Sequence, residues 1–316
     1  MSESTHDGAV AVNPPPSPDD GLSPAELAAK HGLSVSGARP PLLAYVRQLW
    51  ARRHFILAFS RAKLHAQYSQ AKLGQVWQVA TPLLNAAVYL LIFGYILGAK
   101  DGVPGGNKNY IPFLVIGVFL FTFTQQSVMT GVRSISSNLG LVRALHFPRA
   151  SLPISFALQQ LQQLLYSMIV LVVILFAFRE FPTWRWLLVV PVLALQFVFN
   201  SGIALIMARL GSKTPDLAQL MPFILRTWMY ASGVMFPLHY MLTHPDRLGA
   251  PEWVADVVAM NPIAVYMDLM RFCLIPDYTY DHLVPQVWLV AGGWALLFGV
   301  LGFVYFWKAE ERYGRG

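Results

Sequence analysis

Six long apolar stretches of this chain contain no aspartate or glutamate. They cover residues 77–98, 110–131, 152–178, 186–207, 217–237 and 286–307. Each is about 20 residues or longer, the length that a helix needs to cross ~30 Å of hydrocarbon. Carboxylates at membrane depth commonly mark ion or proton pathways, so their absence argues against a carrier driven by protons or sodium. Any transport by this chain therefore takes its energy from another source.

The composition is that of a membrane protein. Of 316 residues, 55% are hydrophobic and only 12% are charged, whereas a soluble domain carries about 25% charged residues. We therefore expect an all-α integral membrane protein with one six-helix membrane domain over residues 77–307. Residues 1–40 read as a disordered, Pro-rich cytoplasmic tail without the apolar core of a signal peptide, and residues 308–316 as a second cytoplasmic tail. Cys273 is the single cysteine, which excludes an intrachain disulfide.

The charges are distributed unequally between the two sides of the predicted membrane domain. Most basic residues precede the first stretch or lie between the second and third and between the fourth and fifth: Arg39, Arg47, Arg52, Arg53, Arg61, Lys63, Lys72, Arg133, Arg143, Arg149, Arg209 and Lys213. The segment between the fifth and sixth is acidic instead: Asp246, Glu252, Asp256, Asp268, Asp277 and Asp281. This positive-inside asymmetry predicts six spans with both termini in the cytoplasm. It explains the net charge of +7 without nucleic-acid binding.

The segment 41–76 precedes the first span and begins with an amphipathic pattern over residues 41–60. Its apolar residues fall on one side of a helix, with Arg53 as an exception: Leu42, Val46, Leu49, Trp50 and Leu57. The segment is too short and too basic to span. We expect a helix lying at the anionic cytoplasmic leaflet. The alternative is a cytoplasmic helix packed on the rest of the protein.

The acidic segment 238–285 is too long for a turn and contains two short amphipathic pieces, 252–259 and 262–274. Pro251 and Pro262 suit first helical turns, and Asn261 suits an N-cap. Neither piece can span, so we expect two external helices that dip into the outer leaflet and cover the mouth of a cavity. The alternative is an ordinary surface loop. The candidate gate residues are Trp253, Asn261, Pro262, Tyr266 and Arg271.

The cytoplasmic loop 133–152 predicts a short helix after Asn138 that Pro148 ends. Leu141, Val142 and Leu145 fall on one side of it, and basic residues surround them. Such an apolar ridge suits insertion into a groove of a partner protein. The alternative is a basic loop that only fixes the topology.

Known catalytic and metal-binding patterns are missing from the sequence. The string Gly211-Ser212-Lys213-Thr214 lacks the glycine spacing of a phosphate-binding loop, and the histidines form no metal-binding pair. No histidine or aspartate accompanies the serines within the spans. We therefore expect no catalytic residue, no metal and no cofactor in this chain. A membrane-embedded glycosyltransferase, acyltransferase or flippase stays open, because Asp268, Asp277 and Asp281 lie on the external side.

Aromatic residues are frequent in the spans and can stack on sugar faces. The candidates for a substrate path are Tyr89, Phe93, Phe121, Tyr166, Phe197, Trp228 and Tyr230. Most membrane aromatics merely pack or face lipid. Arg226 is the one charged residue within a span and is a functional candidate for that reason, unless the span begins later and the side chain reaches the interface.

Three segments together resemble the permeases of ABC-2 type transporters, over roughly residues 41–310. The first resembles the entry to their first span: Tyr68, Leu73, Gly74, Trp77, Pro82 and Leu83. The second is similar to their coupling loop: Ile135, Asn138, Leu141, Val142, Phe147, Pro148, Arg149 and Pro153. The third resembles their external Asn-Pro element at Asn261-Pro262, followed by Arg271. Gln67 and Ala71 depart from the pattern, and the replacement of a basic residue by Gln67 puts a pyrophosphate contact at position 67 in doubt.

The resemblance implies a polysaccharide exporter of the O-antigen, teichoic acid, capsule or actinobacterial galactan kind, in the cytoplasmic (inner) membrane. It implies a homodimer with two separate ATPase subunits that bind ATP and Mg, and a lipid-linked polysaccharide as substrate. The residues implied in ATPase coupling are Asn138, Leu141, Val142, Arg143, Leu145, His146, Phe147 and Arg149. Those expected to meet the lipid pyrophosphate or the interface are Arg47, Arg52, Arg53, Arg61 and Lys63. An ABC-2 exporter of a drug or small lipid is the alternative within the family.

Overall fold

The structure is a computed structural model, and it describes residues 23, 26–27, 30, 39–69, 71–96, 103–104, 106, 109–145, 147–246, 248–279, 283 and 286–313. The chain divides into two compact units, Met1–Ala38 and Arg39–Gly316. In the first unit, the Ser23 N–H donates to the Glu26 carboxylate and the Glu26 N–H to the Ser23 hydroxyl, which is a capping box. The rest of the predicted Pro-rich tail lies outside the described residues.

The described residues of the second unit form helices and no strand, which confirms the all-α prediction. In chain order the α-helices are α2 (Leu42–Ala51), α3 (Arg53–Gln67), α4 (Trp77–Tyr89), α5 (Tyr110–Arg133), α6 (Leu139–Ala144), α7 (Ser151–Ala177), α8 (Val189–Lys213), α9 (Leu217–Ala231), α10 (Leu238–Thr243), α11 (Glu252–Ala259), α12 (Pro262–Leu274) and α13 (Val287–Trp307). A π-helix, η2 (Leu90–Ile96), continues α4, and a 3₁₀ turn, η5 (Trp184–Leu188), leads into α8. Three further 3₁₀ turns are η1 (Gly74–Val76), η4 (Ser136–Asn138) and η7 (Glu310–Arg312).

Among the described residues, five helical segments are long and apolar enough to cross a membrane, or six if the bent pair α11–α12 counts as one span. The five are α4–η2, α5, α7, η5–α8 and α13. The predicted fifth span, residues 217–237, is helical only as far as Ala231, because residues 232–237 form turns. With 15 residues, α9 is roughly 22 Å long, shorter than the ~30 Å hydrocarbon layer.

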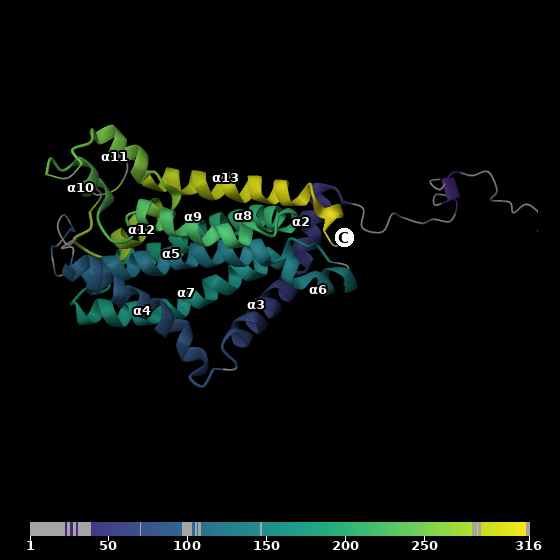
Figure 1. Cartoon of the computed structure of the whole chain (residues 1–316), viewed down its shortest axis with the longest axis horizontal. Helices are drawn as coiled ribbons and strands as arrows, with labels where there is room; N and C mark the ends of the chain where they lie inside the picture. The colour runs from purple at the N-terminus through teal and green to yellow at the C-terminus, as the bar shows by residue number, and fades with distance from the viewer. Residues whose placement is uncertain are drawn as a thin grey trace, which may run out of the picture. The chain divides into compact units, whose positions relative to one another are not determined.

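The helix α5 is the centre of the second unit. Within its apolar window 78% of residues are buried, against 17% for α4–η2 and 22% for α13, and it packs on α4, α7, α8, α9 and α12. Figure 1 shows α10 and α11 at one end of the bundle and α6 with the C-terminal segment at the other. The outer helices therefore keep wide apolar faces that lipid or other protein chains must cover.

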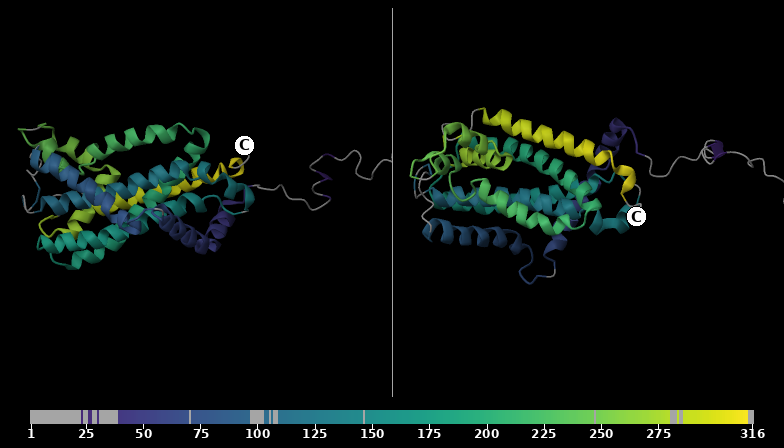
Figure 2. Two further views of the ribbon diagram at one scale, coloured as in Figure 1. Left: turned by 60° about the horizontal axis from the view of Figure 1, so that its bottom comes forward. Right: turned by 45° about the horizontal axis from the view of Figure 1, so that its top comes forward.

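Glycines bring α8 and α13 into backbone contact. A methyl group at Gly202 would overlap the carbonyl oxygen of Phe298, and one at Gly302 would overlap that of Gly202. Small residues allow such close helix packing in membranes, where water supplies no hydrophobic drive for helix association. Figure 2 shows α13 on the side of the bundle opposite α4, so this contact leaves the α4 side free for other functions.

Candidate functional site

A polar cavity of about 270 Å³ lies among α4, α5, α7, α9 and the end of α3. Its lining residues are Gln67, Tyr68, Thr81, Pro82, Asn85, Tyr89, Thr122, Gln125, Gln126, Gln163, Pro222, Arg226 and Met229. Ten of these thirteen side chains can form hydrogen bonds, and none is a carboxylate. The cavity therefore suits a ligand that is rich in hydroxyl groups or negatively charged.

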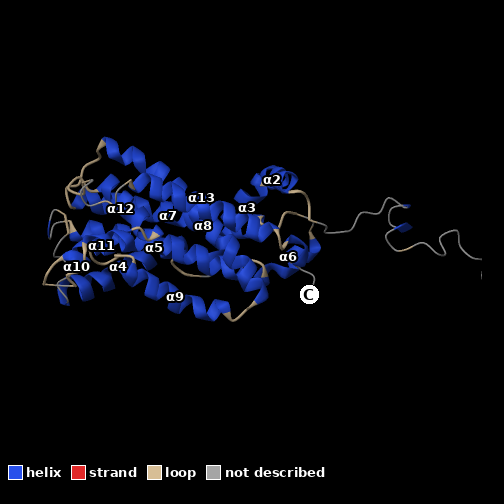
Figure 3. Cartoon of the chain, turned by 90° about the horizontal axis from the view of Figure 1, so that it is seen from above, coloured by secondary structure: helices blue, strands red, loops and turns tan. Residues whose placement is uncertain are grey.

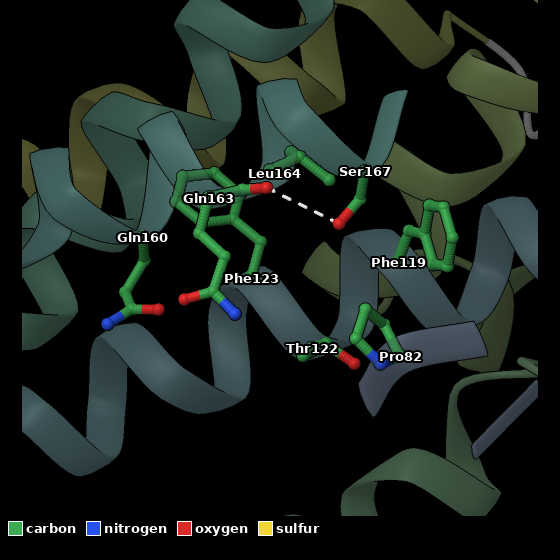
Figure 4. Close-up of a pocket in the computed structure, with 8 residues that line it drawn as sticks. All are labelled: Pro82, Phe119, Thr122, Phe123, Gln160, Gln163, Leu164 and Ser167. Carbon is green, nitrogen blue, oxygen red and sulfur yellow. Dashed lines mark hydrogen bonds between the residues drawn. The ribbon is translucent and has the colours of Figure 1, made fainter. Parts of the chain in front are cut away.

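A second, smaller cavity of about 20 Å³ adjoins the first and shares Pro82, Thr122 and Gln163 with it. Figure 4 draws its lining side chains, with the Ser167 hydroxyl donating to the Gln163 backbone oxygen over 3.3 Å. The volume is enough for about one water molecule. The Oε1 atom of Gln163 is buried without a hydrogen-bond partner among the described residues, so it can accept a bond from a bound molecule.

Of the seven aromatic residues predicted to line a substrate path, only Tyr89 lines the larger cavity. Phe121 is buried in the main core, and Phe197 packs beside that core. Tyr166 is exposed on α7, and Tyr230 is exposed on α9 with its ring 6.4 Å from that of Phe93. The indole N–H of Trp228 donates to Asn261 over 3.0 Å. The substrate-path role of these seven residues stays a prediction.

The sequence-based prediction of the site considered charged and aromatic residues but not the amide side chains within the spans. Asn85, Gln125, Gln126 and Gln163 all line the cavity and come from three different helices. A polar amide in an apolar span is costly unless it finds a partner or lines a polar space. The signal that could have identified the cavity was therefore Asn and Gln placed within the acid-free stretches.

The predicted interfacial helix over residues 41–60 is in fact two helices, because the chain turns at Arg52 between α2 and α3. Tyr45, Ile56 and Leu64 face the protein, while Trp50 and Val46 are exposed. The remaining exposed apolar side chains on this face are Leu43 and Leu57. Arg47, Arg52, Arg53 and Arg61 are exposed as well. This segment thus packs on the protein with one side and presents an apolar and basic side outward, which suits an anionic membrane surface.

The predicted coupling helix exists as α6 and ends at Ala144, four residues before Pro148. Leu141 and Val142 pack in the smaller hydrophobic cluster around Tyr45 and Phe306, and Val142 is only 4% exposed, so the expected three-residue ridge does not protrude as one unit. Leu145, at 53%, and Leu139 are the exposed apolar positions, while Arg143 is also exposed. His146 lies outside the described residues. The coupling role of the loop stays a prediction.

The coupling loop is joined to the interfacial helices by side-chain contacts. The Lys63 ammonium donates to Asn138 Oδ1 over 3.4 Å and lies over the Phe59 ring. The Phe147 ring packs against that of Phe55 in a tilted arrangement, with ring centroids 5.3 Å apart. Lys63 and Phe147, predicted separately for lipid and ATPase contacts, therefore belong to one packed surface.

A buried junction ties the C-terminal turn η7 to α2 and to the end of the coupling loop. The Tyr45 hydroxyl donates to Glu310 Oε2 over 2.8 Å and accepts from the Ala150 N–H over 3.1 Å. The Arg149 N–H donates to Glu310 Oε1 over 2.9 Å, and its guanidinium donates to the Glu310 backbone oxygen. Arg149, predicted to contact the ATPase, thus contacts Glu310.

Burial sets the electrostatics of this junction. It raises the pKa of the Glu310 carboxyl above its usual value, and the hydrogen bonds from Arg149 and Tyr45 oppose that shift only in part. Burial also raises the pKa of Tyr45, and the neighbouring Glu310 adds to the shift. The Tyr45 hydroxyl therefore stays protonated and keeps donating to Glu310.

The two predicted external helices have the expected bounds, and the chain bends by 89° between α11 and α12. Asn261 is the N-cap of α12 and accepts from the Ile263 N–H over 3.2 Å, with Pro262 in the first turn. Pro251 takes the N-cap position of α11 rather than its first turn. Trp253 is 69% exposed, whereas Tyr266 is buried and donates to the Ala291 carbonyl of α13. A third short helix, α10, precedes the pair.

Arg271 is a buried structural centre at this end of the bundle, with 2% of its surface exposed. It forms an ion pair of 2.9 Å with Asp268 and lies over the Phe113 ring. It also donates to the backbone oxygens of Gly233, Val234 and Phe113 over 3.1–3.4 Å. Arg271 therefore connects α12 with α5 and with the turn after α9.

Taken together, the apolar helices, the polar cavity among them and the bent helix pair α11–α12 define a polytopic membrane protein of the transporter class. The model of the ABC-2 type transporter family matches residues 54–275. The chain belongs to the ABC-2 type transporter family.

Named relatives lie within bacterial export systems. The chain is 25% identical over 245 residues to the O-antigen export system permease protein RfbA of Myxococcus xanthus, covering 78% of this chain and 87% of that protein. It is 25% identical over 210 residues to RfbA of Klebsiella pneumoniae, covering 66% and 75%. It is 23% identical over 219 residues to the polysialic acid transport protein KpsM of Escherichia coli, covering 68% and 79%.

Proposed function

We propose that this chain is the permease subunit of an ABC exporter that carries a polysaccharide across the cytoplasmic membrane. Its family and the functions given in the names of RfbA and KpsM support the transport of a polysaccharide. The observation that carries the proposal is the polar, acid-free cavity among the spans. Amide and hydroxyl groups can exchange hydrogen bonds with sugar hydroxyls, and the absence of carboxylates leaves no obvious route for coupling ions.

The finer proposal concerns energy and assembly. Two copies of the chain form the pore, and two separate ATPase subunits with bound ATP and Mg drive it from the cytoplasmic side, where both termini lie. The exposed Leu139 and Leu145 beside α6 provide the apolar contact to the ATPase. The substrate is a polysaccharide attached to a lipid carrier, of the O-antigen, teichoic acid or galactan type.

A drug or small-lipid exporter is the second candidate within the family. The wide apolar faces of α4–η2 and α13 are compatible with hydrophobic substrates, but the amide-lined cavity favours a hydrophilic one. A membrane-embedded transferase would need no ATPase partner. These two alternatives are therefore separable by substrate and by the need for ATP.

The test is polymer export in the native host. Deletion of the gene is expected to leave the polymer inside the cell, and the wild-type gene to restore export. Replacing Gln126 and Gln163 by Leu removes hydrogen-bonding groups from the cavity and is expected to lower export at normal protein abundance. Gln219→Leu is the matched control, because this exposed amide of α9 is not part of the cavity lining. Normal export by the double variant would contradict the proposal.

A further inference from the structure

Arg226 is the charged side chain in the wall of the polar cavity. Of the thirteen lining residues it alone carries a formal charge at neutral pH. It lies nine residues after Leu217, where α9 begins, which corresponds to roughly 14 Å along the helix axis. Figure 3 shows α9 at the edge of the bundle.

Arg226 has no carboxylate counter-charge in the described part of the chain. The ion pairs found there join His239 to Asp256, His244 to Asp246 and Arg271 to Asp268. Asp216, the acid closest in sequence, precedes the first residue of α9, and residues 217–237 contain no acid. An anionic group brought by a ligand would supply the counter-charge.

The neighbouring groups indicate the chemistry of that anion. The amides of Asn85, Gln125 and Gln126 and the hydroxyls of Tyr68 and Tyr89 line the same cavity and can donate hydrogen bonds. A phosphate group offers several acceptor oxygens. The planar guanidinium of arginine can donate two parallel hydrogen bonds to it (bidentate binding), which a lysine cannot. The volume of about 270 Å³ is close to the lower limit of ligand pockets, about 300 Å³.

We propose that this cavity is a phosphate site in which Arg226 holds the diphosphate that joins lipid to sugar, while the amides of α5 and α7 bind adjoining hydroxyls. The inference rests on the proposed function for the presence of a lipid-linked substrate. It assigns the phosphate contact to Arg226, which is exposed and lines the cavity, and not to the exposed arginines of α2 and α3. Phospholipid headgroups offer the same chemistry, so the test must separate the two sources.

The experiment measures binding of radiolabelled undecaprenyl diphosphate to the full chain in phosphatidylcholine nanodiscs, with a parallel series in which phosphatidylglycerol competes. Arg226→Gln is expected to raise the Kd for the diphosphate about tenfold or more, and Arg226→Lys by a smaller factor. Lys213→Gln, at the exposed end of α8, is the matched control and should leave the Kd unchanged. Thermal unfolding of each variant confirms that it is folded.

Two results would overturn the proposal: an unchanged Kd in folded Arg226→Gln, or competition by phosphatidylglycerol as effective as that by unlabelled diphosphate. The second result would assign Arg226 to bulk lipid. Polymer export is scored separately. If the wild-type chain supports export but binding of the diphosphate does not depend on Arg226, the proposed phosphate site is wrong and the proposed function stands. A wild-type chain that supports no export would remove the proposed function whatever the binding result.

Discussion

Replacing Gly202 by alanine tests the packing of α8 on α13, which supports one side of the cavity-bearing bundle. The added methyl group would overlap the backbone of Phe298 and lie 2.7 Å from the Gly299 nitrogen, whereas ordinary contacts begin at 3.4 Å. The opposing atoms belong to backbone and cannot rotate away. The two helices must therefore separate by at least about 0.7 Å, and a gap of this size already forfeits a quarter to a half of the dispersion energy of the affected contacts.

We expect Gly202→Ala to destabilise the protein by roughly 1–3 kcal/mol, the usual cost of overpacking. The measurement is thermal unfolding in detergent, where a loss of this size lowers Tm by several degrees. Gly302→Ala should act similarly, because its methyl group would lie 2.7 Å from the Gly202 carbonyl carbon. The matched control is Gly293→Ala on the same helix, where no atom lies within 4 Å of the added methyl. Equal Tm values for Gly202→Ala and Gly293→Ala would refute the close-packing argument.

Four further predictions concern the cytoplasmic junction, the coupling loop and the external end. Tyr45→Phe removes the hydrogen bonds of the Tyr45 hydroxyl to Glu310 Oε2 and from the Ala150 N–H and should cost about 1–3 kcal/mol in thermal unfolding; an unchanged Tm would contradict the junction. Because burial raises the pKa of Glu310, its contribution to stability is present at acidic pH and is lost as the pH rises through that pKa; Glu310→Gln should flatten this part of the Tm–pH curve. Leu145→Asp should abolish ATPase stimulation while keeping Tm, whereas Val142→Asp at the buried position should lower Tm; the reverse pattern would exclude the exposed face of the loop as the docking surface. Arg271→Met removes the buried ion pair to Asp268 and the hydrogen bonds to three backbone carbonyls and should cost about 3–5 kcal/mol, which Arg271→Lys does not restore; full stability of either variant would show that the network is dispensable.

Local signals predicted the external helices well. Asn261 and Pro262 mark the start of α12, and α11 and α12 have the bounds expected from sequence. Capping and proline geometry act over a few residues, so they can be read without knowledge of the fold. The long spans were equally clear, because their apolar length needs no tertiary information.

Features that depend on tertiary packing were less accessible. The turn at Arg52 and the end of α9 at Ala231 interrupt patterns that read as continuous. The sequence pattern could not tell which side of α6 would be covered, so Val142 was expected in an exposed ridge and is buried. The Tyr45–Glu310 bond joins residues 265 positions apart, and no periodic pattern signals such a pair.

The cavity depended on both kinds of information. Arg226 was identified from sequence as the one charge within a span, but the glutamines around it lie on separate helices and converge only in the folded chain. Arg226 is a candidate ligand-binding residue because amide side chains, and no carboxylate, line the cavity with it.

The central claim is that the chain is a conduit whose movement is driven by a companion ATPase. The most direct measurement is transport of a lipid-linked polysaccharide in liposomes that contain the chain alone, or the chain together with its ATPase partner and ATP. We predict vectorial transport only in the complete system, and only while ATP is hydrolysed. Transport by the chain alone, with or without a proton gradient, would contradict the claim.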